Sequence, residues 1–253
     1  MLKKRVIPTL LYKEGRLVKG VNFKNYRETG LAQSALRVYS SQDADEILLI
    51  DISPIGSPPH EFENLIELVA DECIMPLTVG GGITDINRIS QLLRKGADKV
   101  LLNSSVFNNY EFVRKSVEKF GSQAIMVGID FSYRENMYQL MSRHATCAEP
   151  ISLVDHAIQI QESGAGEFLL TSIDRDGTML GYDLLVLEQL KDFITTPIVV
   201  SGGAGNFHDL SNALNHEMVS AAACASLFHF GDNNPIRARS YLKNQGVPVR
   251  SLK

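Results

Sequence analysis

The sequence has few cysteines, no long hydrophobic run and no excess of positive charge, and each shortage excludes a class of protein. Its three cysteines, Cys73, Cys147 and Cys224, show neither metal-site spacing nor a disulfide framework. An odd number of scattered cysteines is typical of a reduced, intracellular protein. The apolar run near the N-terminus has only about seven residues, too few for a signal peptide or a membrane span. We therefore expect a cytoplasmic protein.

The charge balance argues against two classes of binding partner. Lysine and arginine total 25, and aspartate and glutamate total 29, which gives a net charge of −4. Nucleic acids and anionic membranes bind basic surfaces, so neither is expected as the main partner. A small anionic substrate remains compatible, because a local pocket can be positive on an acidic protein. The six histidines show no metal-ligand spacing, and we expect neither a metal nor a cofactor.

What the sequence does contain is a regular alternation of short β-branched runs and longer amphipathic segments. With 44% hydrophobic residues, the chain can form one large domain spanning residues 1–253. Eight strand–helix units predict an α/β protein with a parallel sheet, either closed into a (β/α)8 TIM barrel or open and doubly wound. The expected strands are Arg5–Leu11, Glu46–Asp51, Pro76–Val79, Lys99–Leu102, Ala124–Ile129, Glu167–Thr171, Pro197–Ser201 and Ser220–Cys224. The expected helices include Glu61–Asp71, Ile86–Lys95, Glu111–Phe120, Leu153–Ser163, Asp183–Leu190 and Asp209–Leu214, with Asp85 and Asn206 as N-caps.

An internal repeat favours the closed barrel. Segments of the first half recur in the second half roughly 122 residues later. Two halves of four units each, related by a pseudo-twofold axis, build a closed barrel directly. The matching pairs are Leu77–Ile83 with Val199–Gly205, Ile50–Ser53 with Ile173–Asp176, and Leu102–Phe107 with Cys224–Phe228.

Two glycine-rich runs predict a phosphate site in each half. Gly80–Gly82 and Gly202–Gly205 each follow a strand and open a helix, where backbone N–H groups bind phosphate if no Cβ blocks the approach. Glycines that only make tight turns are the alternative, but two matching runs favour cradles for a ligand with a phosphate at each end. The expected phosphate-binding residues are Gly82, Asn103 and Ser104 in the first half, and Gly177, Gly203, Ala225 and Ser226 in the second.

Two connections are much longer than the others, Tyr12–Gly30 after the first strand and Phe131–Pro150 after the fifth. Both leave the carboxyl ends of strands, where barrel enzymes carry active sites and lids. His144 and Cys147 lie in the second connection, which we expect to be a solvated hairpin rather than part of the site.

The motifs in these regions resemble those of the HisF family, the cyclase subunits of imidazole glycerol phosphate synthase. The resembling runs are TVGGGI, GADKVLLNSS, FGSQAIMVGID, GAGEFLLTSIDRDGTMLGYD and IVVSGGAG, and the resemblance extends from Lys4 to Lys243. It implies a barrel whose mouth binds a bisphosphorylated aminoimidazole precursor, with a HisH-like glutaminase on the opposite face. Ammonia from the glutaminase passes through the barrel core in that family, and a lyase reaction at the mouth closes the imidazole ring.

The resemblance also implies roles for residues at both ends of the barrel. A ring of charges at the floor matches the family's ammonia gate, although an ion-pair ring without a conduit is the alternative. This ring is Arg5, Glu46, Lys99 and Glu167. Positions that meet the glutaminase are matched by Asp98 and Gln123, and the chain has no recognisable glutaminase segment of its own. The substrate mouth is matched by Lys19, Asp51, Thr171 and Asp176.

One catalytic position departs from the family. The family places an aspartate at the end of the first strand and another at the end of the fifth, as general acid and base. Asp130 supplies the second carboxylate, but Leu11 occupies the first position and cannot transfer a proton. Glu14 or Asp176 taking over the lost role is the alternative. Loss of a general acid or base lowers a rate by about 10²–10⁴-fold.

Further departures fall on the mouth and spare the floor. Gly30–Ala32 lacks the family's acidic Asp-Pro, and Ile52–Pro59 is a proline-rich turn in place of the usual loop. This distribution resembles the HisF-like paralogues of surface-polysaccharide loci, which are thought to supply ammonia to a third, sugar-modifying protein for an acetamidino group. Three functions stay open: such an ammonia-delivering subunit acting on a phosphorylated small molecule, an authentic cyclase of histidine biosynthesis, and a non-catalytic scaffold that activates the glutaminase.

Overall fold

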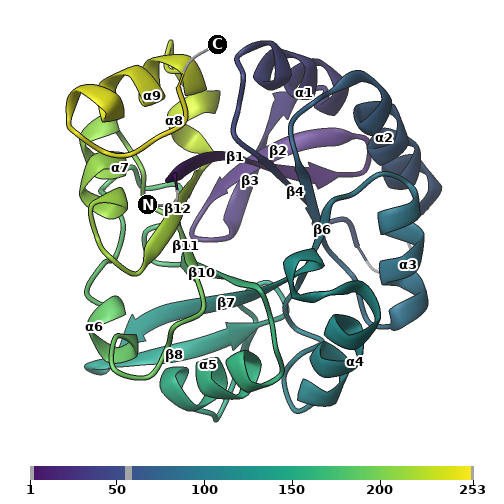
Figure 1. Ribbon diagram of the computed structural model, residues 1–253, viewed down its shortest axis with the longest axis vertical. Helices are drawn as coiled ribbons and strands as arrows, with labels where there is room; N and C mark the ends of the chain where they lie inside the picture. Colours follow the sequence, from purple (N-terminus) through teal and green to yellow (C-terminus); the bar gives the residue numbers. More distant parts are fainter. Residues whose placement is uncertain (1–2, 55–58, 252–253) are drawn as a thin grey trace.

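The centre of the molecule is a ring of eight parallel strands, seen in a computed structural model that describes residues 3–54 and 59–251 (Figure 1). The barrel strands are β1 (Arg5–Lys13), β4 (Ile47–Asp51), β5 (Leu77–Gly80), β6 (Lys99–Leu102), β7 (Ile125–Arg134), β10 (Glu167–Ser172), β11 (Ile198–Ser201) and β12 (Val219–Cys224). Each strand pairs with the next in this order, and β12 pairs with β1 to close the ring. The predicted (β/α)8 barrel is therefore confirmed, and the open sheet is excluded.

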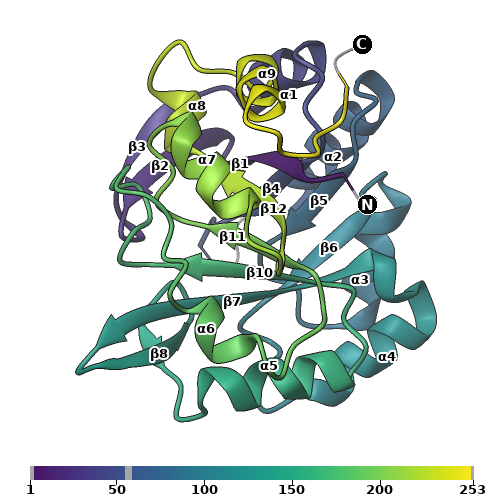
Figure 2. The ribbon, with the colours of Figure 1, turned by 60° about the vertical axis from the view of Figure 1, so that its left-hand side comes forward.

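Helices cover the outside of the barrel (Figures 1 and 2). They are α1 (Ala32–Ser41), α2 (Pro59–Glu72), α3 (Ile86–Arg94), α4 (Tyr110–Phe120), α5 (Leu153–Glu162), α6 (Leu187–Leu190), α7 (Phe207–Leu214), α8 (Ser226–His229) and α9 (Pro235–Asn244), with a short 3₁₀ turn at Ser122–Ala124. Their apolar faces and the outward residues of the strands form one large buried cluster. None of the described helices has the length and apolar character needed to cross a membrane.

The inward residues of the barrel follow the two-residue period of a β-strand, which sorts them into levels. Along β1, Arg5 lies at the floor, Ile7 in the apolar middle and Thr9 at the mouth. The middle level excludes charge and is a separate buried cluster. It contains Ile7, Leu48, Leu101, Met126, Leu169, Val199, Ala221 and Ala223. A charged floor and a polar mouth are thus separated by an apolar layer.

The predicted N-caps are confirmed. The Asp85 carboxylate accepts hydrogen bonds from the N–H groups of Asn87 and Arg88 at the start of α3. Asn206 forms a capping box with Asp209, since each side chain accepts a hydrogen bond from the other residue's N–H, at 3.0 and 3.1 Å. These contacts fix the two helix starts immediately after the glycine runs.

The helix expected at Asp183–Leu190 is wrong for its first half. Only Leu187–Leu190 is helical. The Asp183 carboxylate accepts a hydrogen bond from the Tyr138 hydroxyl at 3.2 Å, which holds this segment against another part of the chain. A tertiary contact therefore overrides the local helical pattern.

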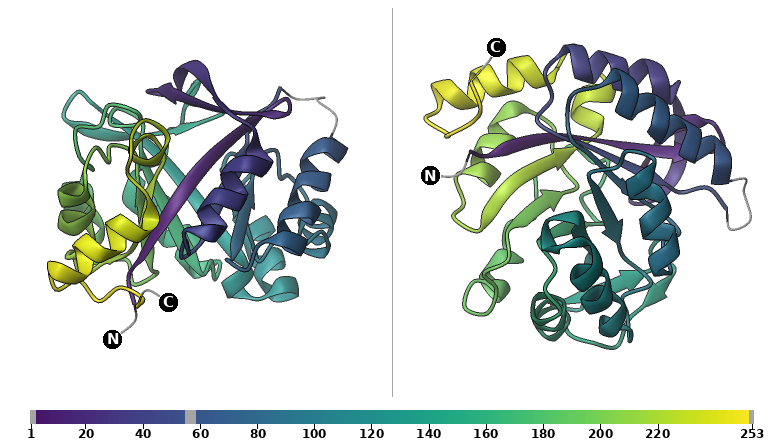
Figure 3. Two further views of the ribbon diagram at one scale, coloured as in Figure 1. Left: turned by 90° about the horizontal axis from the view of Figure 1, so that it is seen from above. Right: turned by 45° about the vertical axis from the view of Figure 1, so that its right-hand side comes forward.

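The two long connections are β-hairpins rather than loops. The first strand continues to Lys13 and pairs with β2 (Arg16–Val21), which pairs with β3 (Lys24–Gly30). The fifth barrel strand continues to Arg134 and pairs with β8 (Met137–Ser142), which pairs with β9 (Cys147–Ala148). Figure 3 (left) shows both hairpins at the end of the molecule opposite the N-terminus. The first strand of each half thus carries a hairpin at the mouth.

Replacement of Asn206 by alanine should lower the free energy of unfolding by about 1 kcal/mol, because the Asp209 N–H loses its side-chain acceptor. Urea denaturation followed by circular dichroism measures the change. Asn244→Ala, in the exposed last residue of α9, is the matched control and should change stability little. Equal stability of the two variants would contradict the role of the capping box.

Candidate functional site

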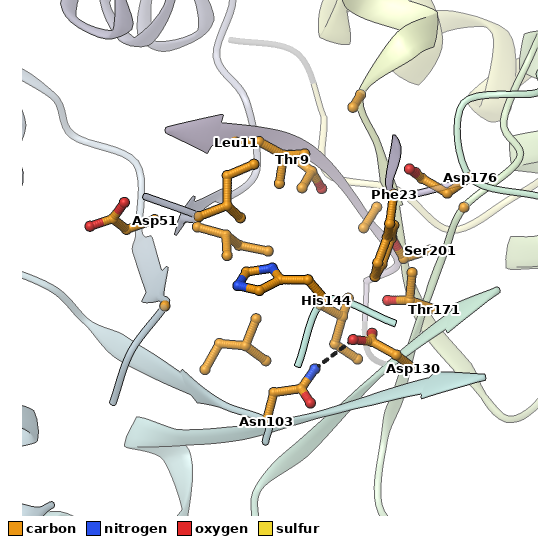
Figure 4. Close-up of a pocket in the computed structure, with 18 of the residues that line it drawn as sticks. Thr9, Leu11, Phe23, Asp51, Asn103, Asp130, His144, Thr171, Asp176 and Ser201 are labelled. Atoms are coloured by element: carbon orange, nitrogen blue, oxygen red, sulfur yellow. Dashed lines mark hydrogen bonds between the residues drawn. The ribbon is translucent and has the colours of Figure 1, made fainter. Parts of the chain in front are cut away.

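One pocket opens at the carboxyl ends of the barrel strands and is lined by both halves of the chain (Figure 4). The structure brings into it every residue that the sequence predicts for the mouth and the cradles. These are Leu11, Lys19, Asp51, Gly82, Asn103, Ser104, Asp130, Thr171, Asp176, Gly177, Gly203, Ala225 and Ser226. Because they come from strands and turns on all sides of the ring, barrel closure is what assembles them.

The glycines of the two runs are required for different reasons. Both Gly82 and Gly203 have a positive φ, at +60° and +116°, which disfavours other residues. A Cβ on Gly203 would lie 2.1 Å from the carbonyl oxygen of Gly181, so packing alone demands glycine there. A Cβ on Gly82 would meet no described atom within 4 Å. The space beside Gly82 is therefore open to a ligand.

The polar side chains of the first cradle are partly engaged within the protein. The Asn103 amide donates a hydrogen bond to the Asp130 carboxylate at 2.8 Å. The Ser104 hydroxyl accepts a hydrogen bond from the backbone N–H of Arg143 at 2.9 Å, and its own proton remains available to a ligand. The hairpin tip at Arg143 thus closes down onto this cradle.

Several polar atoms that line the pocket have no hydrogen-bond partner within the described chain. They are the Thr9 hydroxyl, the Asn103 amide oxygen and the Ser105 hydroxyl, all buried. Unpaired buried polar atoms are costly, and a polar ligand satisfies them. Within residues 3–54 and 59–251, no group of three or more histidine, cysteine, aspartate or glutamate side chains is arranged to hold a metal ion.

Asp130 is the most perturbed carboxylate of the mouth. Burial raises its pKa to about 6, and the nearby charge of Asp176 acts in the same direction. Hydrogen bonds from Asn103 and Thr171 oppose the rise by stabilising the ionised form. A carboxyl group with a pKa close to neutrality can both accept and donate a proton, which is what general acid–base chemistry requires.

On the other side of the pocket, the first hairpin brings a cation to Asp176. The Lys19 ammonium of β2 lies 2.6 Å from the Asp176 carboxylate, and Lys19 is almost fully buried. Burial raises the pKa of Asp176, and Lys19 opposes that rise. The backbone N–H of Asn22 donates to the Asp176 carbonyl at 2.8 Å, so the hairpin is attached to this turn through backbone and side chains.

Leu11 of β1, where the resemblance led us to expect an aspartate, stands in the pocket wall. It pairs with Ile50 of β4 and Val18 of β2, and its side chain borders the pocket (Figure 4). Of the two possible replacements, Asp176 lies in the pocket but is paired with Lys19, and Glu14 lies in the hairpin turn away from the described lining. Of the proline-rich turn after β4, residues 55–58 lie outside the described part of the chain.

The connection that carries His144 is a hairpin and the residue is exposed, as expected, but His144 also borders the pocket. His144 lies at the tip between β8 and β9 and lines the pocket (Figure 4). Cys147 lies in β9, partly buried, and does not line the described pocket. No sequence spacing indicates this difference, because it depends on how the hairpin folds over the mouth.

At the opposite end of the barrel, the four predicted floor charges meet as ion pairs. Arg5 contacts both Glu46, at 2.5 Å, and Glu167. Lys99 contacts the same two carboxylates at 3.0 and 3.2 Å. Burial alone would raise the pKa of Glu167, but Arg5 and Lys99 together hold it below its usual value. Alternating charges therefore compensate one another where single buried charges would be costly.

The amino-terminal face carries the two positions predicted to meet a partner. Asp98 and Gln123 are both exposed there. One oxygen of Asp98 accepts a hydrogen bond from the Leu77 N–H at 2.8 Å, which orients the carboxylate at the start of β5. Sequence reasoning missed Ile74, which precedes β5 and is 91% exposed.

The chain resembles known proteins along most of its length. The profile of the histidine biosynthesis protein family matches residues 5–234. The imidazole glycerol phosphate synthase subunit HisF of Chlorobium limicola is 39% identical over 251 residues, which cover 99% of this chain and all of that protein.

Replacement of Asp130 by asparagine should stabilise the protein at neutral pH. The folded-state pKa of about 6 lies above the usual value of 3.8, so ionisation of Asp130 opposes folding and its cost appears as pH rises from about 4 to 6. Wild type and Asp130→Asn should unfold with equal free energy below pH 4. Above pH 7 the variant should be more stable by roughly 2–3 kcal/mol. Urea denaturation across this range measures the difference, and a pH-independent gap would contradict the assignment.

Proposed function

Because this chain belongs to the histidine biosynthesis protein family and is HisF-like along nearly its whole length, we propose that it is a synthase subunit that uses ammonia from a separate glutaminase. The ammonia enters at the barrel floor, crosses the apolar interior and meets a phosphorylated acceptor at the mouth. Both proteins work in the cytoplasm.

The floor and the interior support passage of a small neutral molecule. Arg5 and Lys99 are each shared between two carboxylates, so a side chain can swing aside without leaving its partners wholly unpaired. Above them, the inward residues are apolar and include the small side chains of Ala221 and Ala223. Ammonia is neutral when it leaves a glutaminase, and an apolar layer of this kind admits it while excluding ions.

The amino-terminal face supports docking of the glutaminase. Asp98 and Gln123 offer exposed polar groups, and Ile74 offers an aliphatic anchor beside them at the start of β5. A central apolar residue surrounded by polar contacts is the usual composition of an interface hot spot. The same face holds the gate charges, so docking there delivers ammonia directly to the floor.

The acceptor is where this chain departs from HisF. The observation that carries this conclusion is Leu11, an apolar residue in the mouth wall where acid–base chemistry on the imidazole precursor needs a carboxylate. We infer that the mouth serves a different acceptor, and that the ammonia is used to build an acetamidino group on a surface-polysaccharide sugar. A third, sugar-modifying protein then completes the reaction at this face.

A second candidate is favoured by the extent of the relationship to HisF. Identity of 39% across the full length, with all predicted mouth residues except the first aspartate gathered in one pocket, also fits an authentic cyclase of histidine biosynthesis. In that case another group in the mouth replaces the carboxylate lost at Leu11. The two candidates differ in one measurable reaction.

Purified protein with ammonium chloride and the bisphosphorylated aminoimidazole precursor should form little imidazole product, because Leu11 cannot transfer a proton. Leu11→Asp should raise the rate by about 10²–10⁴-fold, the usual contribution of a general acid or base. Leu11→Asn is the matched control, equal in shape but without a titratable group, and should gain nothing. Robust product formation by the wild-type protein would reject the sugar role and establish the cyclase.

Replacement of Ile74 by aspartate should weaken binding of the HisH-like glutaminase of the same organism. A hot-spot loss of about 2 kcal/mol corresponds to roughly 30-fold in the dissociation constant. Isothermal titration calorimetry measures it. Leu185→Asp, at an exposed aliphatic residue in the connection between β10 and α6, is the control and should bind normally. Equal weakening by both variants would argue against docking at the amino-terminal face.

A further inference from the structure

We propose that His144 is a catalytic residue of this mouth, and that its imidazole exchanges a proton with the bound acceptor while Asp130 exchanges another. The inference rests on the proposed function in one respect, namely that ammonia meets an acceptor in this pocket. It assigns to His144 a proton transfer on that acceptor from the hairpin side of the pocket, and not the ring-closing role of the family's first aspartate.

The hairpin tip is built to hold this imidazole in place. Arg143, His144 and Ala145 all have positive φ values, of 50°, 56° and 62°. Three successive non-glycine residues in the left-handed region are unfavourable and persist only where surrounding contacts impose them. The Thr146 hydroxyl donates to the Arg143 carbonyl at 2.6 Å, and the Arg143 N–H donates to Ser104 across the pocket.

A second set of contacts braces the base of the same hairpin. The Ser142 hydroxyl donates to the Glu149 carboxylate at 2.5 Å, and the Gln139 amide donates to the Glu149 carbonyl at 2.6 Å. The backbone on either side of the tip is thus fixed from both strands. Such bracing positions one side chain, and the side chain at the centre of the turn is His144.

The imidazole projects over the pocket and is exposed at its opening. Figure 4 shows it projecting between the wall that carries Leu11 and the wall that carries Asn103 and Asp130. Within the described chain, no hydrogen bond or ion pair occupies the His144 ring, so both of its nitrogens are available to a ligand. The other titratable groups facing the pocket are Lys19, Tyr26, Asp51, Asp130, Asp176 and Cys224.

Most of these other groups are already committed. Lys19 and Asp176 neutralise each other, and burial raises the pKa of both Tyr26 and Cys224, so neither readily ionises. Histidine is the side chain that ordinarily exchanges protons near neutral pH. His144 and Asp130 therefore form the pair best suited to acid–base work at this mouth.

Addition of ammonia to a carbonyl carbon needs two proton transfers. The ammonia lone pair forms the C–N bond, and the C=O π electrons move to the oxygen, which takes a proton from the His144 imidazolium. The new ammonium nitrogen gives a proton to the Asp130 carboxylate. The two groups then exchange the roles of acid and base. Asp130, now protonated, gives its proton to the hydroxyl, which leaves as water. His144, now neutral, removes an N–H proton to leave an imine. Both groups return to their starting states.

A first test needs no substrate. Nuclear magnetic resonance of protein labelled with ¹⁵N-histidine gives the titration curve of His144, identified by its loss in His144→Gln. If the two groups share the pocket, Asp130→Asn removes a negative charge near the imidazole and should alter this titration curve. Asp192→Asn, at an exposed site in the connection after α6, is the charge-matched control and should leave it unchanged. A His144 curve unaffected by Asp130→Asn would overturn the proposal.

A second test measures the chemistry with a defined bisphosphorylated ketose. Ribulose 1,5-bisphosphate, ammonium chloride and cyanoborohydride convert any imine formed at the mouth into an amine, which mass spectrometry quantifies. The wild-type protein should accelerate amine formation over the solution reaction, and His144→Gln should reduce that protein-dependent rate by about 10²-fold. Leu11→Asp in the His144→Gln background should restore part of it, and His208→Gln, on the surface, should change nothing.

The outcomes separate this inference from the proposed function. The ketose reaction needs neither the glutaminase nor the surface-polysaccharide sugar, so a failed search for an acetamidino product leaves the role of His144 intact. An unchanged rate in His144→Gln, or the absence of acceleration by the wild-type protein, would overturn it. A variant that loses affinity for the ketose, measured by calorimetry, in proportion to its loss of rate would make His144 a binding group only.

Discussion

Closure of the barrel is the constraint on which the rest of the structure depends. Pairing of β12 with β1 and of β7 with β10 closes the ring without a free edge, and all eight barrel strands run parallel. All carboxyl ends then meet at one rim and all amino ends at the other. Because alternate side chains of a strand point to the same face, Arg5, Ile7 and Thr9 all point into the barrel, at successive levels along β1. The pocket and the floor ring are therefore two consequences of one topology.

The buried carboxylates at the two ends of the barrel have pKa values shifted in opposite directions. At the floor, Glu167 has two cationic partners and its pKa is lowered, so the charged state is part of the stable fold. At the mouth, Asp130 has hydrogen bonds but no cationic partner within residues 3–54 and 59–251, and its pKa is raised. The floor is thus electrostatically satisfied, whereas the mouth retains a group whose proton is readily exchanged. Stability is concentrated at one end and reactivity at the other.

Sequence reasoning reached those features that local chemistry or the repeat controls. The barrel, the N-cap at Asn206 and the glycine cradles follow from periodicity, capping preferences and the correspondence of the two halves, whereas the other mouth residues were implied by the resemblance to the HisF family. It failed where a contact between residues far apart in the sequence determines the local structure. The segment before Leu187 stays non-helical because Tyr138 holds Asp183, and His144 enters the pocket because Ser104 holds the neighbouring backbone. The folding of a hairpin over the mouth produces no periodic pattern in the sequence.

Each half of the barrel closes over the other rather than over itself. The first half's hairpin attaches through Asn22 to Asp176 of the second half, and the second half's hairpin attaches through Arg143 to Ser104 of the first. Neither hairpin can form its contacts without the other half of the barrel. A half-barrel on its own would have its cradle uncovered and its hairpin without a partner surface. Joining the two halves therefore does more than complete a ring of strands, because each half also covers part of the other.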